Sequence, residues 1–172
     1  MNRPACIAFH AVLTPEQIKN ICAVGDKAMQ KAATVVDADP LHRRSLVSWF
    51  PPTGEVKAIV HHVNEARYQF DLWDVEPLQY TVYSEGGYYG WHMDLGPGPA
   101  QRRKLSLTIQ LSDPSEYEGG DFEAQTGSEV ITGPKERGTV IAFPSWIIHR
   151  VTPVTRGIRR SLVVWATGEP FR

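Results

Sequence analysis

The sequence contains few cysteines and no long apolar run. Only Cys6 and Cys22 occur, without Cys-x-x-Cys spacing, so neither a disulfide framework nor a zinc finger is indicated, and both are expected to be small core residues. Pro4 and His10 interrupt the short apolar run near the N-terminus, which therefore does not resemble a secretory signal or a membrane span. We expect a cytoplasmic protein without a membrane partner.

The chain also lacks an excess of charge of either sign. It has 18 Lys and Arg residues against 19 Asp and Glu residues, which gives no overall attraction toward nucleic acid or an anionic lipid surface. We therefore expect no nucleic-acid partner. Its 172 residues include 42% hydrophobic and 10% aromatic residues, enough to bury one core. A single domain over residues 1–172 is predicted.

Two helical patterns precede residue 78. Thr14 and Gln17 are spaced as a capping box, and a helix to about residue 31 follows them. A second amphipathic pattern runs from residue 54 to about residue 70, with its valines on one face. We expect residues 1–77 to form a helical region that supports a sheet.

From residue 78 onward, short runs rich in Val, Ile, Thr, Tyr and Trp are separated by Gly, Pro and Asp clusters, which is typical of strands and turns. In the clearest run, residues 105–111, apolar residues alternate with Ser106, Thr108 and Gln110. Further strands are predicted at 46–50, 78–83, 120–124, 138–143, 148–152 and 158–166, with turns at 118–121 and 152–157. The pattern predicts a mainly β protein with flanking N-terminal helices, an α+β arrangement whose strand spacing suits a sandwich or jelly roll.

Three residues form a candidate metal site. In a strand, residues two apart project to the same face, so His92 and Asp94 can offer an imidazole and a carboxylate to one ion. His149, at the start of a later β run, can supply a third ligand. Two histidines and one carboxylate leave open coordination positions and suit Fe(II). The same donors can hold zinc, for instance in a hydrolase, so these residues alone do not fix the metal.

Arg159 and Ser161 share one face of the apolar run at residues 158–166. An inward arginine on a buried strand is costly unless an anion pairs with it, and a guanidinium beside a hydroxyl suits a carboxylate. The alternative interpretation places Arg159 and Arg160 on a solvated face or in a salt bridge. If Arg159 faces inward, Arg160 faces the opposite side of the sheet.

Taken together, the residues of the second half resemble a known family. The resemblance is carried by Tyr83, His92, Asp94, the turn at 118–121, His149, Arg159 and Ser161. In ligand order, in the interval from His149 to Arg159 and in the Arg-x-Ser spacing, the chain is similar to the 2-oxoglutarate/Fe(II) dioxygenase superfamily, specifically its prolyl-4-hydroxylase-like branch. The resemblance covers about residues 78–166.

The resemblance implies a double-stranded β-helix, a jelly roll of cupin-like form, with its core at residues 78–166. It implies Fe(II) held by His92, Asp94 and His149, and the C5 carboxylate of 2-oxoglutarate held by Arg159 with help from Ser161. Tyr83 is the nearest match to a tyrosine that contacts 2-oxoglutarate in that branch. The implied enzyme is an oxidoreductase that couples O₂ and the conversion of 2-oxoglutarate to succinate and CO₂ to hydroxylation of an aliphatic C–H, with ascorbate as a supporting reductant.

Three functions stay open on the sequence. The leading one is hydroxylation of a prolyl or similar residue in a peptide or protein, and the second is the same chemistry on a free amino acid or other small molecule. The third, of another class, is a non-redox cupin-like metal-binding or binding module. An open aromatic groove would favour a peptide, whereas a closed pocket with extra Arg or Lys would favour a free amino acid.

Two loops could border the substrate. The segment at residues 86–91, rich in Gly, Tyr and Trp, can be a mobile flap or a hairpin with aromatic core anchors. The segment at residues 96–104 ends in three basic residues and can form a lip of the cleft or a solvated turn.

Overall fold

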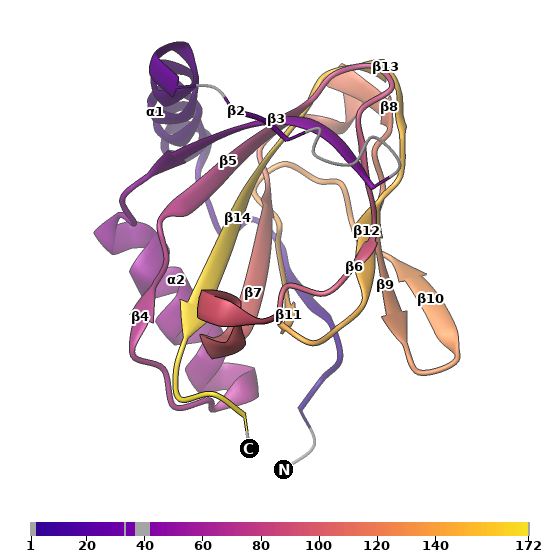
Figure 1. The fold of residues 1–172 in the computed structure, drawn as a ribbon. Helices are drawn as coiled ribbons and strands as arrows, with labels where there is room; N and C mark the ends of the chain where they lie inside the picture. The colour runs from indigo at the N-terminus through magenta and orange to yellow at the C-terminus, as the bar shows by residue number, and fades with distance from the viewer. Residues whose placement is uncertain (1–2, 33, 37–41, 172) are drawn as a thin grey trace.

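The computed structural model describes residues 3–32, 34–36 and 42–171, which form a curled sheet with two helices packed on one side (Figure 1). The helices are α1 Pro15–Ala32 and α2 Gly54–Val63, which continues into a π-helical turn at Asn64–Tyr68, with short 3-10 turns at Gly98–Arg102 and Pro114–Glu116. The strands are β1 Ile7–Phe9, β2 Thr34–Val36, β3 Arg43–Phe50, β4 Asp74–Val75, β5 Leu78–Tyr83, β6 Tyr88–His92, β7 Arg103–Gln110, β8 Tyr117–Gly119, β9 Phe122–Thr126, β10 Glu129–Thr132, β11 Val140–Pro144, β12 His149–Val151, β13 Val154–Gly157 and β14 Arg159–Thr167.

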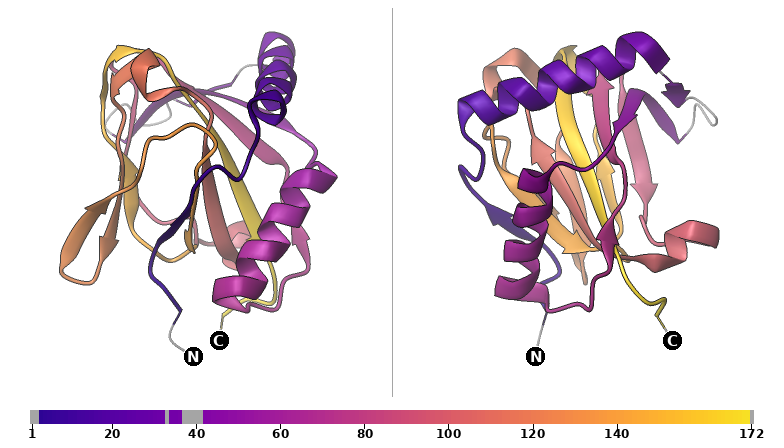
Figure 2. Two further views of the ribbon diagram at one scale, coloured as in Figure 1. Left: turned by 180° about the vertical axis from the view of Figure 1, so that it is seen from behind. Right: turned by 90° about the vertical axis from the view of Figure 1, so that its left-hand side faces the viewer.

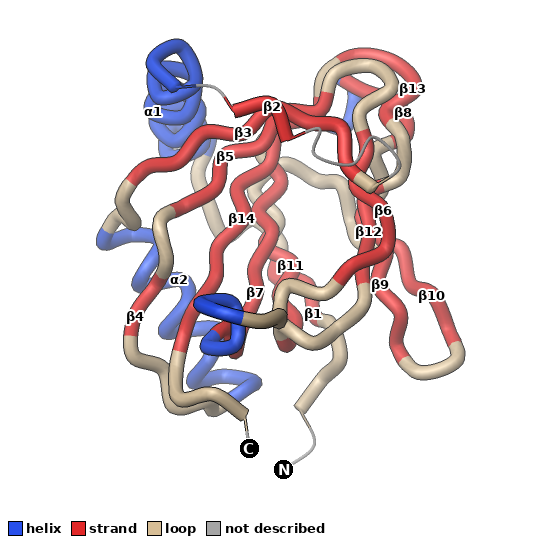
Figure 3. Tube along the Cα trace, in the orientation of Figure 1, coloured by secondary structure: helices blue, strands red, loops and turns tan. Residues whose placement is uncertain are grey.

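Most strands belong to one hydrogen-bonded sheet. Its order is β1-β11-β7-β14-β5-β3-β6-β12-β9-β10, with β2 added to β3 and β4 added to β14, while β8 and β13 form a separate pair. Every strand pairing in the described part of the chain is antiparallel. The sheet curls on itself because β3 pairs with β5 along most of its length and with β6 at its start (Figure 3). The curled antiparallel sheet confirms the predicted jelly-roll fold.

The central strands β7 and β14 have two different buried faces. On β7, Leu105, Leu107 and Ile109 belong to the core that the helices cover, while the alternating Ser106 and Thr108 point away from it. Both sets are buried, because the polar face lines the interior of the curled sheet rather than solvent. The alternation that predicted this strand therefore separates a packing face from a face that can carry chemistry.

The two helices cover the outer face of β3, β5, β7 and β14 (Figure 2). The predicted capping box begins α1, since Thr14 N donates to Gln17 Oε1 at 2.7 Å and Gln17 N donates to Thr14 Oγ1 at 3.3 Å. Close contact with the sheet is possible because residue 25 is glycine: a Cβ there would lie 2.4 Å from the ring of Tyr80 on β5. Ser48 on β3 donates to the Gly25 carbonyl at 3.0 Å.

The N-terminal region is less helical than predicted. Besides α1 and α2, residues 1–77 contain β1, β2, β3 and β4, and β3 extends over Arg43–Phe50 rather than 46–50. The first three residues of β3 were not predicted because Arg43 and Ser45 are polar. Both are nevertheless buried in the interior of the curled sheet. Residues 37–41, which precede β3, lie outside the described residues.

Local conformation corrects two further predictions and adds one strand that was not predicted. Residues 88–91 belong to β6 and do not form a flap, and the predicted turn at 152–157 contains β13. The exposed strand β10 was not predicted, because its polar residues give no buried face. Among the described residues, no helix combines the length and the apolar character that crossing a membrane requires.

Candidate active site

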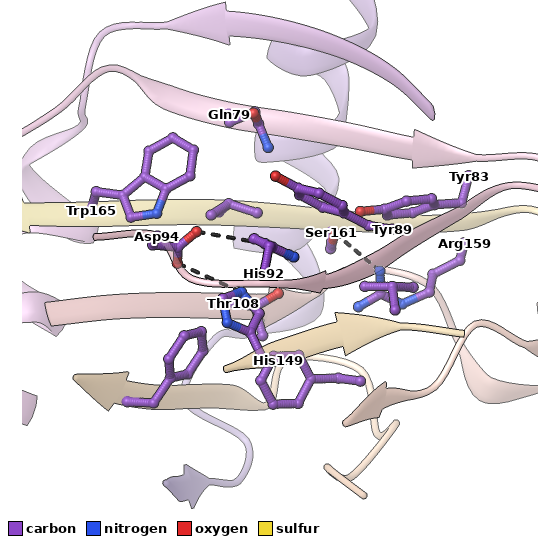
Figure 4. Close-up of a pocket in the computed structure, with 14 residues that line it drawn as sticks. Gln79, Tyr83, Tyr89, His92, Asp94, Thr108, His149, Arg159, Ser161 and Trp165 are labelled. Carbon is purple, nitrogen blue, oxygen red and sulfur yellow. Dashed lines mark hydrogen bonds and ion pairs between the residues drawn. The ribbon is translucent and has the colours of Figure 1, made fainter. Parts of the chain in front are cut away.

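A pocket inside the curled sheet brings together every residue predicted for the site. Side chains from β5, β6, β7, β9, β11, β12 and β14 line it together with Asp94 from the bend after β6, and the strand residues include Tyr83, His92, His149, Arg159 and Ser161. Figure 4 shows the two histidines and Asp94 between Trp165 at one end of the pocket and Arg159 at the other. The residues predicted to bind metal and those predicted to bind a carboxylate thus share one cavity.

The two histidines and the aspartate converge from two neighbouring strands. His92 at the end of β6 is the cross-strand partner of His149 at the start of β12. His92 Nε2 lies 3.8 Å from Asp94 Oδ1, and His149 Nε2 lies 3.7 Å from Asp94 Oδ2. One ligand atom from each residue lies within 4.8 Å of the others, close enough for a single ion to bind all three.

Asp94 reaches this cluster for a different reason than the one predicted. Strand alternation was expected to place His92 and Asp94 on one face, but β6 ends at His92 and Asp94 lies in a bend beyond it. The bend is fixed by backbone bonds, because Leu95 N donates to the Ser145 carbonyl at 2.8 Å. The prediction that Asp94 lies near His92 is confirmed, but the bend after β6, and not strand alternation, brings the two side chains together.

Hydrogen bonds at the far side of each imidazole prepare both histidines to bind a cation. His92 Nδ1 lies 2.8 Å from the Gly90 carbonyl and His149 Nδ1 lies 2.9 Å from the Ile147 carbonyl. A carbonyl can only accept, so each Nδ1 carries the proton and each Nε2 presents a lone pair. Both lone pairs belong to the nitrogens nearest Asp94. This outer hydrogen bonding is the pattern that orients histidine ligands in metal sites.

The electrostatics of the cluster also suit a cation. Burial, followed by the proximity of His149, lowers the pKa of His92 to about 3, so its ring is neutral near neutral pH. Asp94 Oδ2 is buried and has no hydrogen-bond partner among the described residues. A buried carboxylate oxygen without a donor is costly, and a divalent cation would compensate it. The donor set of two imidazoles and one carboxylate therefore fits Fe(II).

Arg159 provides the opposite charge at the other end of the pocket. Its side chain is 1% exposed, and no carboxylate forms an ion pair with it among residues 3–32, 34–36 and 42–171. Its Nη1 donates to Ser161 Oγ at 3.3 Å and its Nη2 to Gln110 Oε1 at 3.0 Å, while Nε has no partner. A buried guanidinium with a free donor and two neutral partners has the hydrogen-bonding capacity that a carboxylate would satisfy.

The register of β14 places Arg159 inward, which decides between the two interpretations that the sequence left open. Arg159, Ser161, Val163 and Trp165 line the pocket, whereas Leu162 and Val164 belong to the helix-covered core. Tyr83 is the cross-strand partner of Arg159, and its ring centroid lies 5.4 Å from the guanidinium carbon. The interpretation of Arg159 as a solvated residue is therefore wrong.

Sequence reasoning missed Tyr89, whose ring stacks on that of His92 at 3.5 Å with an interplanar angle of 12°. Tyr89 and His92 are three residues apart, so strict alternation puts them on opposite faces. The pairing of β6 with β12 shifts register here, since Val151 pairs with Tyr89 while His149 pairs with His92. This bulge turns both rings into the pocket. Bulges leave little trace in a sequence, although the glycine at residue 90 was an available signal.

Arg103, in the basic segment at residues 96–104, lies near the predicted metal ligand Asp94. Arg103 forms a two-point contact with Glu76, with Nε to Oε1 at 2.9 Å and Nη2 to Oε2 at 2.8 Å. Its guanidinium carbon lies 3.7 Å from the ring centroid of Trp165, and Nη1 lies 3.4 Å from the Asp94 carbonyl. Arg103 thus contacts two residues that line the pocket, Trp165 and Asp94, instead of lying in a solvated turn.

Known sequences resemble part of this chain, including the segment where the site residues lie. A family model described as the 2OG-Fe(II) oxygenase superfamily matches residues 78–167. A PKHD-type hydroxylase from Acidovorax ebreus (strain TPSY) is 38% identical over 97 residues, which cover 53% of this chain and 43% of the relative. The chain spans no more than half the length of the curated relatives it matches first.

Solved structures share the fold over almost the whole chain. A Pseudomonas putida prolyl-4-hydroxylase superposes with a TM-score of 0.78 at 17% identity, covering 96% of this chain and 93% of that one. A Trichoplax adhaerens prolyl hydroxylase, in complex with a peptide fragment of the hypoxia inducible factor oxygen degradation domain, gives 0.76 at 12% identity, covering 95% and 83%. These superpositions confirm the predicted double-stranded β-helix.

Proposed function

Because the chain belongs to the 2OG-Fe(II) oxygenase superfamily, we propose that it is a 2-oxoglutarate- and Fe(II)-dependent hydroxylase that acts as a single domain. It would convert an aliphatic C–H bond to C–OH and 2-oxoglutarate to succinate and CO₂. The observation that carries the proposal is the pairing, in one pocket, of a three-residue cation site with a buried arginine that has no acidic partner among the described residues.

In this proposal His92, Asp94 and His149 hold Fe(II). The bound ion would supply the centre at which O₂ is reduced and 2-oxoglutarate oxidised. The protein contributes a neutral His92 ring, two Nε2 lone pairs and one carboxylate oxygen without a donor among the described residues, and all of these groups can bind a cation. Because three residues supply the ligands, the remaining coordination positions are left for co-substrates.

Arg159 would bind the C5 carboxylate of 2-oxoglutarate with help from Ser161, which lines the same pocket, while Ser161 and Gln110 hold the guanidinium in place. Tyr83 would cover the same end of the pocket, since its ring lies against Arg159. Charge-assisted hydrogen bonds of this kind give both affinity and orientation. Ser161 and Gln110 act as neutral acceptors, so they leave the positive charge available to an anion.

The substrate that we propose is a prolyl or similar aliphatic residue in a peptide or protein. The matched relatives are PKHD-type hydroxylases and the superposed structures are prolyl hydroxylases, one of them in complex with a peptide. A non-redox binding module is disfavoured, because a binding protein needs neither an open-sided cation site nor a second, anion-binding end in the same pocket.

The test is succinate release from 2-oxoglutarate in the presence of Fe(II) and ascorbate, with a panel of proline-containing peptides and free amino acids. We expect succinate formation that depends on Fe(II), and a mass increase of one oxygen atom in the accepted substrate. Slow succinate release without a substrate would still support the class. Asp94→Ala should abolish turnover in both assays. Metal-independent turnover, or full activity in Asp94→Ala, would contradict the proposal.

A further inference from the structure

Arg43, at the start of β3, is a second buried guanidinium for which the proposed function has no role. Its side chain is 8% exposed. Nε donates to Ser45 Oγ at 2.8 Å, but Nη2 is buried and has no hydrogen-bond partner in the part of the chain that the structure describes. Within residues 3–32, 34–36 and 42–171, no carboxylate forms an ion pair with it.

Other arginines of the chain show what a satisfied guanidinium looks like here. Arg103, Arg150 and Arg156 each lie within 3 Å of a glutamate oxygen, and all three are more exposed than Arg43. A buried cation without an anion costs free energy that a neutral hydroxyl offsets only in part. Arg43 therefore has the same unmet need as Arg159, for which 2-oxoglutarate is the proposed anion.

Arg43 lies one aromatic ring away from a proposed iron ligand. Its guanidinium carbon is 4.4 Å from the ring centroid of Tyr89, its cross-strand neighbour on β6. His92 stacks on the same ring at 3.5 Å. Because the His92 ring covers one face of Tyr89, the guanidinium lies against the other. An anion held by Arg43 would thus lie on the far side of Tyr89 from His92.

We propose that Arg43 binds a carboxylate of the primary substrate and so selects for acidic substrates. This inference rests on the proposed function and adds to it a substrate class. The carboxylate can belong to a free amino acid or to an acidic residue beside the reacting residue of a peptide, since the recognition chemistry is the same. Because Arg159 would bind 2-oxoglutarate, the two arginines would bind different ligands.

The experiment measures binding by calorimetry to the protein loaded with Mn(II), which does not support turnover, and saturating 2-oxoglutarate. The probes are N-acetylproline and its amide, and a blocked tripeptide with proline beside glutamate or beside glutamine. We expect the wild type to bind the acid of at least one pair about 10- to 100-fold more tightly than its neutral counterpart, as for a charge-assisted hydrogen bond. The pair that shows the difference identifies the source of the carboxylate.

Three variants make the result specific. Arg43→Gln should bring the ratio between acid and neutral probes close to one, and Arg43→Lys should keep a preference for the acid because the charge is retained. Arg44→Gln is the matched control, since Arg44 is the exposed neighbour on the same strand. It should behave like the wild type. The affinity of all three variants for 2-oxoglutarate should match that of the wild type.

Two results would overturn the inference. One is a wild type that binds acids and neutral probes alike, as it would if a carboxylate of this chain already neutralised Arg43. The other is Arg43→Gln with an unchanged ratio, or with weakened 2-oxoglutarate binding in place of weakened acid binding. Either result leaves the proposed function intact, because that function is tested separately by Fe(II)-dependent succinate release.

Discussion

Asp94 supplies the only negative charge among the three proposed iron ligands. Its Oδ2 is buried without a donor, so the carboxylate is held in place without being neutralised. We predict that Asp94→Asn lowers metal affinity by more than the roughly 10- to 100-fold that loss of an outer-shell partner costs.

Thermal unfolding with and without Co(II) measures this effect, because a bound metal stabilises the wild type by about 2.7 kcal/mol at a concentration 100 times its Kd. The variant should show no such shift. Without metal it should be at least as stable as the wild type, since a buried unpaired charge has been removed. A Co(II)-dependent shift equal to that of the wild type would contradict the assigned role.

Arg159 can be examined in the same way. Arg159→Gln keeps a hydrogen-bonding side chain but removes the charge, so affinity for 2-oxoglutarate should fall by about 10- to 100-fold. A titration of succinate release against 2-oxoglutarate gives the change. Arg160→Gln is the control, because Arg160 alternates with the residues that line the pocket. Equal KM values for the two variants would refute the role of Arg159.

At the level of elements, β14 and β6 show what a sequence can reveal about a site. The alternation of β14 correctly predicted that Arg159 and Ser161 share one face, because the strand is regular, and the structure shows that this face is the inner one. On β6 a bulge breaks the alternation, and Tyr89 was missed. Arg43 was not predicted to be part of a strand, because an arginine in a polar segment is usually expected in an exposed loop. In a regular strand, the order of the side chains predicts which residues share a face. The positions of bulges and buried charges depend on partners distant in sequence, so the order alone does not predict them.

The packing of α1 on the sheet offers a test of an element contact. Gly25→Ala places a methyl group where Tyr80 now lies, so we expect a loss of about 1–3 kcal/mol from overpacking. Urea unfolding measures the difference. Gly54→Ala, at the start of α2, is the matched control, since a Cβ there meets nothing within 4 Å. It should be neutral or slightly stabilising. Equal effects at both positions would show that helix propensity, not contact with Tyr80, decides the outcome.

At the scale of the whole molecule, the metal would add a link between two strands that already pair through their backbones and bring the His92 and His149 rings to 4.2 Å. His92 and His149 come from β6 and β12, and Asp94 from the bend beyond β6. We predict that Mn(II) slows amide hydrogen exchange in β6, β12 and this bend more than in β7 and β14, which the helices already cover. Exchange followed by mass spectrometry, with EDTA as the reference, tests this. Uniform protection of all strands would argue against an ion at this position.

The two buried faces of β14 have a consequence for how such a protein can change over generations. Odd-numbered positions from 159 to 165 line the pocket, while positions 162 and 164 belong to the helix-covered core. A mutation at an odd position alters what the pocket accepts, and one at position 162 or 164 alters whether the chain folds. Substrate preference can therefore drift along one side of a single strand while the other side stays under selection for stability.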